Sequence, residues 1–338
     1  MAPVRAMAEQ QAENAGKTGL EEFREELPQV WAQIPDKGLF FGLLALWLLI
    51  FQFFGNATYG YIDTPSLFVW LKNAYEAPGS DDAHGTLIPF VVLALFWWKR
   101  DELLAVPKRL WWPGLLGLAA AMGLHVVGFA AQQSQVSVVA MFAGVYSLMA
   151  LVWGWRLARA SFFPFLLFVF CVPLTGVAEP VTVPLRHLSA DISVFIARNL
   201  LGIPIVQVGV QLMDPQGRYT YEVAAACSGM RSVITLLALT TVYGWMNFRP
   251  WWKRALVVAM ALPLALLGNV FRLVSIIVAA EAFGEGAGKF VHDWFGFVTF
   301  AMSLGILMAL GHWLRDPEPE ETLPPASPRT EESLPETA

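Results

Sequence analysis

Long apolar segments recur along most of the chain and alternate with short polar connections. The apolar runs occupy about residues 38–54, 86–98, 113–131, 136–155, 160–178, 228–246, 254–280 and 292–314. A helix needs roughly 20 apolar residues to cross a hydrocarbon core of about 30 Å, and most of these runs are long enough. The pattern predicts an all-α polytopic membrane protein with about eight transmembrane helices. A seven-helix arrangement remains open if the second run, which is short, is re-entrant.

The two polar ends of the chain have different characters. Residues 1–37 are rich in charge, and "LEEFREELPQVW" predicts a partly helical segment. Residues 315–338 are rich in Pro and Glu, a composition typical of a disordered tail. We therefore divide the chain into a polar N-terminal segment (1–37), a transmembrane domain (38–314) and a C-terminal tail (315–338).

The composition agrees with a membrane protein. The 338 residues are 56% apolar and 14% charged, whereas a soluble domain carries about 25% charge. The 14 Trp and 24 Phe point the same way, because aromatic side chains concentrate at membrane interfaces. The net charge of −5 arises mostly from the polar ends. We expect the lipid bilayer as a partner and no nucleic acid.

The distribution of Lys and Arg predicts the topology. Basic residues follow the even-numbered runs, the connection after the third run has none, and the one after the seventh has only Lys289. Because basic residues favour the cytoplasmic side, both termini are predicted to be cytoplasmic. The basic residues that carry this prediction are Lys99, Arg100, Lys108, Arg109, Arg156, Arg159, Arg249, Lys253, Arg254 and Arg315.

The longest connection, residues 179–227, is predicted to lie outside the cytoplasm. It begins with apolar residues at helical spacing beside Arg186, Asp191 and Arg198, which predicts an amphipathic helix on the membrane surface. Alternating residues around a Pro-Gln-Gly turn follow and predict a small hairpin. The hairpin leads to Cys227 at the start of the sixth run.

Three residues with useful chemistry converge on the outer layer of the predicted bundle. Cys227 lies at the outer end of its run, and its distance from mid-run Cys171 disfavours a disulfide. Arg272 lies 18 residues beyond Arg254, about 27 Å along a helix, which places it in the outer leaflet. His292 opens the last run at its outer end.

These residue types suit nucleophilic catalysis by a thiol. A nearby base or cation makes a thiol a competent nucleophile, and histidine can accept its proton. Arginine can stabilise an oxyanion. The helix start at Ser228 and Gly229 favours the thiolate, and Arg231 either reinforces this effect or anchors a substrate carboxylate. Asn269 lies on the helical face of Arg272 and is expected to hold its guanidinium.

Two other interpretations weigh against this hypothesis. A lone cysteine at a helix end is most often inert, but an arginine within a span is costly and usually faces a functional cavity. A transporter or channel would use Arg272 and Arg231 to line an anion path. It predicts polar residues at several depths, whereas here they gather in the outer layer. The few His and Cys residues form no metal-ligand set, and we expect neither a metal nor a cofactor.

Three short motifs occur in one order along the chain. They are "ACSGMRS" (226–232), "NVFRL" (269–273) and "HDWFG" (292–296), and "DDAHGTLIPF" (81–90) precedes them. Together they resemble the exosortase/archaeosortase family, over about residues 38–314. The resemblance implies a membrane-embedded cysteine transpeptidase. In it, Cys227 is the nucleophile, Arg272 stabilises the oxyanion or thiolate, and His292 is the acid and base. Ser228, Gly229, Arg231, Asn269, Asp293 and His84 are supporting residues.

The resemblance also implies a substrate class and a location. The substrates are membrane-anchored exported proteins that end in a short motif such as Pro-Glu-Pro, a transmembrane helix and a basic cluster, the PEP-CTERM type of sorting signal. Cleavage outside the membrane through a thioester on Cys227 precedes transfer to an unidentified acceptor. The expected location is the inner (cytoplasmic) membrane of a prokaryote, with the site facing outward. A cysteine protease that only hydrolyses remains an alternative.

Overall fold

The computed structural model describes residues 19–58, 63–77, 80, 82–174, 179–209, 211–217, 219–222 and 229–315. Helices make up nearly all of its regular structure, which confirms the predicted all-α fold class. They are α2 (Gly19–Gln33), α3 (Lys37–Phe54), α4 (Leu67–Glu76), η1 (Ala83–Thr86), α5 (Ile88–Trp98), α6 (Arg100–Ala105), α7 (Gly114–Ala130), α8 (Ser134–Trp153), α9 (Trp155–Ala160), α10 (Phe162–Leu166), η2 (Leu167–Cys171), α11 (Glu179–Phe195), η3 (Ile196–Leu200), α13 (Gly229–Asn247), α14 (Trp251–Ala259), α15 (Ala261–Phe283) and α16 (Glu285–Trp313). The strands are β1 (Val206–Val208), β2 (Gln211–Met213) and β3 (Thr220–Glu222).

Apolar helices coincide with each of the eight predicted runs. Within the described residues, four segments are long and apolar enough to cross a membrane: α3, α8, α14 with α15, and α16. Four shorter apolar helical segments match the other runs, at Ile88–Trp98, Gly114–Ala130, Phe162–Cys171 and Val233–Asn247. The number that crosses the bilayer stays a prediction. Helix α4 lies in a connection where the sequence pattern predicted no helix.

The N-terminal half packs around large side chains from α3, α4, α7 and α8. Trp47 of α3 is buried against α8, where its indole Nε1 donates to the carbonyl of Met141 at 2.9 Å. Gly144 makes room for this ring, because a Cβ at that position would lie 2.0 Å from it. The close approach of α3 and α8 therefore depends on the pairing of a large and a minimal residue.

The C-terminal half is built on a hairpin of α15 and α16. Gly284, with φ of +87°, joins the two helices and supplies a backbone conformation that favours glycine. Helix α11 packs on α15 through a buried face of small residues, among them Ser189, Ala190 and Ser193. The predicted amphipathic helix is thus present, and small rather than bulky residues form its buried face.

A middle layer joins the halves. Ile88 of α5, Phe163 of α10, Cys171 of η2 and Ile234 of α13 share one buried cluster. The rings of Phe163 and Trp245 stack face to face, with centroids 4.3 Å apart. Helix α13 therefore contacts the N-terminal half while it also packs on α14 and α15.

The segment before α13 forms an antiparallel sheet in the order β1-β2-β3. The turn at Pro215 to Gly217 joins β2 and β3, so the predicted hairpin is confirmed, and β1 adds a strand that the pattern had not indicated. Tyr219 anchors the sheet to α15 by donating its hydroxyl to Glu281 Oε2 at 3.2 Å. Gln207 of β1 donates to Asp191 of α11 at 2.7 Å.

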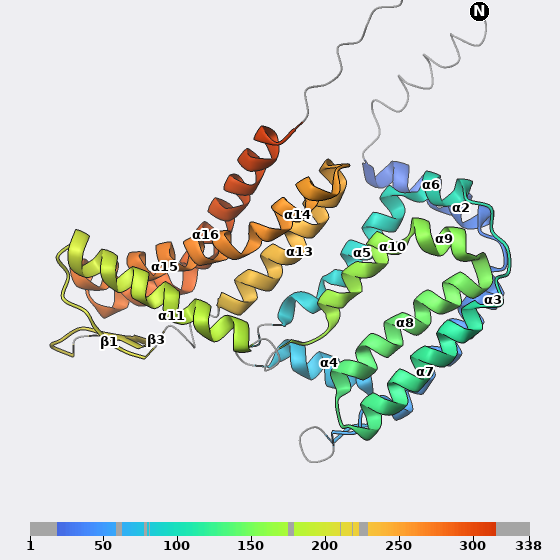
Figure 1. Cartoon of the computed structure of the whole chain (residues 1–338), viewed down its shortest axis with the longest axis horizontal. Helices are drawn as coiled ribbons and strands as arrows, with labels where there is room; N and C mark the ends of the chain where they lie inside the picture. The colour runs from blue at the N-terminus through green and yellow to red at the C-terminus, as the bar shows by residue number, and fades with distance from the viewer. Residues whose placement is uncertain are drawn as a thin grey trace, which may run out of the picture.

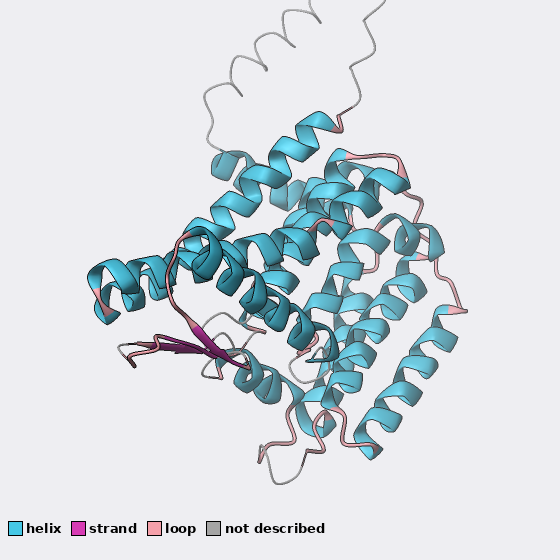
Figure 2. Ribbon diagram, turned by 60° about the vertical axis from the view of Figure 1, so that its left-hand side comes forward, coloured by secondary structure: helices cyan, strands magenta, loops and turns pink. Residues whose placement is uncertain are grey.

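Figure 1 shows the arrangement of these parts. The described ends of the chain, at α2 and at the end of α16, lie at one end of the molecule together with α6. Helix α4 and the sheet lie at the opposite end, and Figure 2 shows the sheet beside the helices. This arrangement supports the predicted topology, with the sheet outside and both termini inside, which stays a prediction.

Candidate active site

The α15–α16 hairpin brings Arg272 and His292 together. Arg272 lies 11 residues before Phe283 and His292 lies seven residues after Glu285, so their backbones are about 16 Å and about 10 Å from the hairpin tip. The guanidinium bridges this offset, since its Nη2 donates to the carbonyl oxygen of His292 at 2.5 Å. The predicted convergence of these two residues is therefore present in the structure.

Two nitrogens of this pair remain without a hydrogen bond. Arg272 Nε and His292 Nε2 are both buried, and neither has a hydrogen-bond partner among the described residues. A buried polar atom without a partner costs about 1–3 kcal/mol, so most such atoms in folded proteins are satisfied. The pair therefore presents one strong donor and one open imidazole nitrogen at the same place.

Asp293 orients the imidazole from the other side. His292 Nδ1 lies 2.9 Å from Asp293 Oδ1, and the Asp293 side chain is 56% exposed. A carboxylate accepts but cannot donate, so in the neutral imidazole this contact favours the ring proton on Nδ1. His292 Nε2 is then the lone-pair nitrogen, the form that a general base requires.

Polar and apolar side chains together line a small cavity next to Arg272. The cavity measures about 30 Å³, and Asn269, Thr299 and Ser303 line it beside the guanidinium. This volume admits about two water molecules. Asn269 shares the cavity with Arg272, but the guanidinium bonds to the His292 carbonyl and not to Asn269. Among the described residues, the carbonyl that α16 offers is the partner of the guanidinium, and the supporting role of Asn269 stays a prediction.

A second small cavity adds a cation that the sequence analysis did not assign to the site. Arg186 of α11 lines a space of about 10 Å³ together with Ser189, Val233 and Asn269. Val233 lies one turn inside α13, so Arg186 lies near the start of that helix. The sequence pattern predicted α11 as a helix on the membrane surface, so it did not indicate that Arg186 lies near the start of α13. The pairing of α11 with α15 that brings it inward is not encoded in a short motif.

The nucleophile itself falls outside the described residues, as does Ser228. Gly229, two residues after Cys227, is the first residue of α13. Arg231 lies in the first turn of that helix, and its side chain is outside the described part. His292 does not open its helix as predicted, because α16 begins seven residues earlier at Glu285. The helix continues before the apolar run through residues 285–291, which include two glycines, Glu285 and Lys289.

His84 lies in η1, which packs on α4, α5 and η2. Gly85 lets this segment approach Tyr75, since a Cβ there would lie 2.5 Å from the ring. The carbonyl of Gly85 accepts a hydrogen bond from Cys171 Sγ at 3.7 Å, and Cys171 shares a cluster with Ile234 of α13. The segment of His84 is thus linked through η2 to the helix that follows Cys227, whereas the role of His84 stays a prediction.

One family model matches most of the chain. Residues 70–309, 240 of the 338, match the family model described as "Transmembrane exosortase (Exosortase_EpsH)". The chain belongs to the transmembrane exosortase family. Searches of curated proteins and of solved structures returned no significant match. The matched region contains η1, α13, Arg272 and His292, and membership supports an exosortase-type function in a membrane, the processing of exported proteins with sorting signals.

Proposed function

We propose that this protein is a cysteine peptidase and transpeptidase that cleaves C-terminal sorting signals of membrane-anchored proteins outside the cytoplasm. One observation carries the proposal: Arg272 Nη2 donates to the His292 carbonyl at 2.5 Å, while Arg272 Nε and His292 Nε2 are buried without a hydrogen-bond partner among the described residues. Cys227 precedes the first residue of α13 by two positions, and that helix packs on α15.

The chemistry follows from the roles of the atoms. His292 Nε2 accepts the proton of the Cys227 thiol, and the thiolate attacks the carbonyl carbon of the scissile peptide bond. Arg272 faces the oxygen that becomes negative, where a fixed cation stabilises the transition state more than the ground state. The protonated imidazole then gives its proton to the leaving amine, and a thioester on Cys227 remains.

The thioester is the branch point between the two remaining alternatives. Attack by an amine or hydroxyl of an acceptor completes a transfer, whereas attack by water completes a hydrolysis. The cavity of about 30 Å³ beside Arg272 has room for water, and the described residues around it form no wider path that would favour a transported anion. We therefore retain transfer as the main hypothesis and hydrolysis as the second outcome of the same chemistry.

The substrate class follows from the family. We expect proteins that end in a motif of the Pro-Glu-Pro type, a transmembrane helix and a basic cluster. The substrate helix lies in the same bilayer as the enzyme, so the motif enters from the membrane surface. We therefore expect the scissile bond at the depth of Gly229, the first residue of α13.

The test is processing of a reporter protein that carries such a signal. We expect Cys227→Ala to abolish the release of the reporter while the enzyme still inserts in the membrane. A matched control is His312→Ala, a substitution at an exposed histidine near the other end of α16, which should process normally. Normal processing by Cys227→Ala would contradict the proposed nucleophile, and the mass of the released product separates transfer from hydrolysis.

A further inference from the structure

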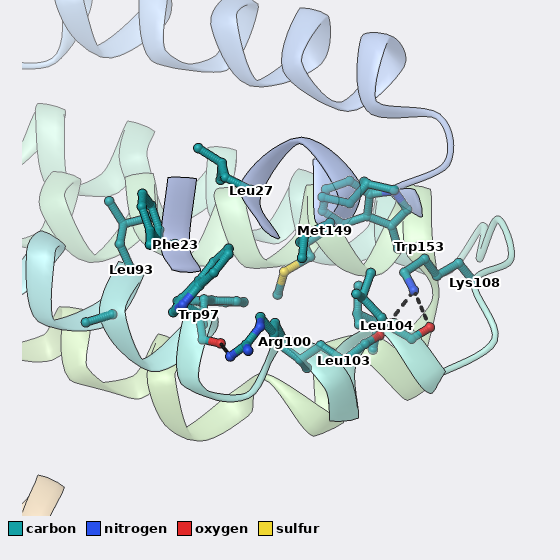
Figure 3. Close-up of a pocket in the computed structure, with 15 residues that line it drawn as sticks. Phe23, Leu27, Leu93, Trp97, Arg100, Leu103, Leu104, Lys108, Met149 and Trp153 are labelled. Carbon is teal, nitrogen blue, oxygen red and sulfur yellow. Dashed lines mark hydrogen bonds between the residues drawn. The ribbon is translucent and has the colours of Figure 1, made fainter. Parts of the chain in front are cut away.

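A large cavity lies far from the candidate active site, beneath α2. It measures about 650 Å³, and helices α2, α5, α6, α8 and α9 all contribute to its walls. Figure 3 shows Leu27 and Phe23 of α2 on one side and Trp97, Leu103 and Met149 on the others. The lining is almost entirely apolar. Helices α2 and α6 lie at the same end of the molecule as the described chain ends (Figure 1).

Helix α2 presents an apolar stripe to this cavity. Phe23, Leu27 and Val30 follow one another at the spacing of one helical face and line it, and Ile34, the residue after the end of α2, lines it as well. Phe23 meets the ring of Trp97 edge to face at 4.5 Å, yet 39% of Phe23 stays exposed. The stripe therefore borders open volume more than it fills it. Helix α2 also precedes the region that matches the exosortase family.

An apolar volume of this size calls for an occupant. Ligand sites usually measure about 300–1,000 Å³ and are mostly apolar, and this cavity falls within that range. Within a bilayer, the apolar material at hand is the acyl chain of a lipid. Because this end of the molecule is predicted to be cytoplasmic, the source would be the inner leaflet.

A polar recess adjoins the apolar cavity and shares three residues with it. The recess measures about 510 Å³ and contains Glu26 and Asp101, together with the amides of Gln29 and Gln33. Arg100 lines both spaces, so it lies at the boundary where an amphiphile changes from chain to head. Its Nη2 pairs with Glu26 Oε2 at 2.8 Å.

The charges of the recess match a headgroup with both signs. Lys108, the other cation of the cavity wall, uses its ammonium on the carbonyls of Leu103, Leu104 and Val106. Arg100 has five N–H donors in a fork that suits phosphate. Glu26 and Asp101 provide carboxylates for an ammonium group. This pairing favours a zwitterionic head over a purely anionic one.

We propose that this composite site binds one glycerophospholipid with a primary ammonium headgroup. Its acyl chains fill the apolar cavity, its phosphate contacts Arg100, and its ammonium lies between Glu26 and Asp101. The lipid ties α2 to α5 and α6 and does not take part in the chemistry at Cys227.

The test uses the full-length chain in nanodiscs with equal amounts of phosphatidylethanolamine and phosphatidylglycerol that carry the same acyl chains. Native mass spectrometry after mild extraction should show one retained phosphatidylethanolamine, preferred by about tenfold over phosphatidylglycerol, the effect of one charge-assisted contact. The double variant Glu26→Gln with Asp101→Asn should lose the preference. These carboxylates lie at the surface of the site, so the double variant should still insert.

A second variant tests the apolar part. Ala94→Phe places a ring in the cavity, because Ala94 lines it, and should reduce retention of the lipid. The matched control is Ala120→Phe at an exposed position of α7 outside the cavity, which should retain lipid like the unmodified chain. A chain that retains no lipid, a preference for phosphatidylglycerol, or equal retention by Ala94→Phe would each overturn the proposal.

Discussion

The two halves of this membrane protein treat their buried polar groups differently. In the N-terminal half, Trp47 donates to the carbonyl of Met141 at 2.9 Å, and His125 Nδ1 lies 3.1 Å from Ser137 Oγ. In the C-terminal half, Arg272 Nε and His292 Nε2 are buried without a hydrogen-bond partner among the described residues. The N-terminal half uses these polar groups to fix helix contacts, whereas the Arg272–His292 pair keeps hydrogen-bonding capacity unused among the described residues.

The difference indicates which region contributes mainly to the stability of the fold and which contributes mainly to the activity. Around Trp47 the packing is close, and the neighbouring Gly144 has no space for a methyl group. Around Arg272 the helices leave small polar cavities, and the nearby Gly296 has open space. Substitutions in the first region should therefore affect folding, and substitutions in the second should affect activity in a folded protein.

The largest effect on the processing rate is expected from substitutions of Arg272 and His292. Arg272→Ala removes the cation that faces the developing oxyanion, and His292→Ala removes the base. We expect each to lower the processing rate by about 10²–10³-fold while the protein still inserts in the membrane. Arg272→Lys should recover little of the activity, because lysine lacks the fork that reaches both the His292 carbonyl and a substrate oxygen. A rate assay on the reporter measures these effects, and near-normal rates would contradict the assigned roles.

The next effect is a loss of stability in the N-terminal half. Gly144→Ala places a Cβ 2.0 Å from the Trp47 ring, so α3 and α8 must move apart. We expect a loss of about 1–3 kcal/mol, the usual effect of overpacking. Thermal unfolding of the detergent-solubilised protein measures it. The rate per folded molecule should stay close to normal, and a selective loss of activity at full stability would break the comparison.

A smaller effect is expected from the residue that orients the imidazole. Asp293→Asn keeps a hydrogen-bonding group beside His292 Nδ1 but removes the carboxylate that fixes the ring proton there. We expect a fall of about tenfold in the processing rate, a modest loss because the side chain is half exposed and solvent weakens the contact. Thermal stability should not change. An unchanged rate would show that the imidazole is oriented without Asp293.

The smallest effect is expected at Gly296, the counterpart of Gly144. A Cβ there meets nothing within 4 Å, and alanine favours a helix over glycine by up to about 1 kcal/mol. Gly296→Ala should therefore leave the stability unchanged or slightly raised. Thermal unfolding of the Gly296→Ala and Gly144→Ala variants, measured side by side, sharpens the comparison. Equal destabilisation by both substitutions would mean that the two regions are packed alike.

Much of the architecture was predictable because apolar length and periodicity dominate in a membrane protein. The eight apolar runs, the helix near "LEEFREELPQVW" and the hairpin around Pro215 all appear in the structure. The extra strand β1 and helix α4 were missed, since each is short and lacks a strong pattern. The start of α16 was also misplaced, because Glu285, Lys289 and two glycines interrupt the apolar pattern in its first two turns.

The sequence predicted which residues lie at the candidate site better than it predicted the contacts between them. Depth along the helices predicted that Arg272 and His292 meet, and the hydrogen bond between them confirms it. The partner of the guanidinium could not be predicted, because a backbone carbonyl carries no sequence signal. Arg186 was missed as a neighbour of Asn269, since the docking of α11 on α15 depends on small buried residues and not on a motif.

The central claim is that Cys227 attacks a peptide carbonyl, and a trapped intermediate tests it most directly. The full-length enzyme is mixed with a reporter bearing the sorting signal, quenched at low pH and digested for mass spectrometry. The account predicts an acyl group from the reporter on Cys227, released by hydroxylamine and absent in Cys227→Ala. Processing of the reporter at a normal rate by Cys227→Ala, with no adduct on the unmodified enzyme, would contradict the account.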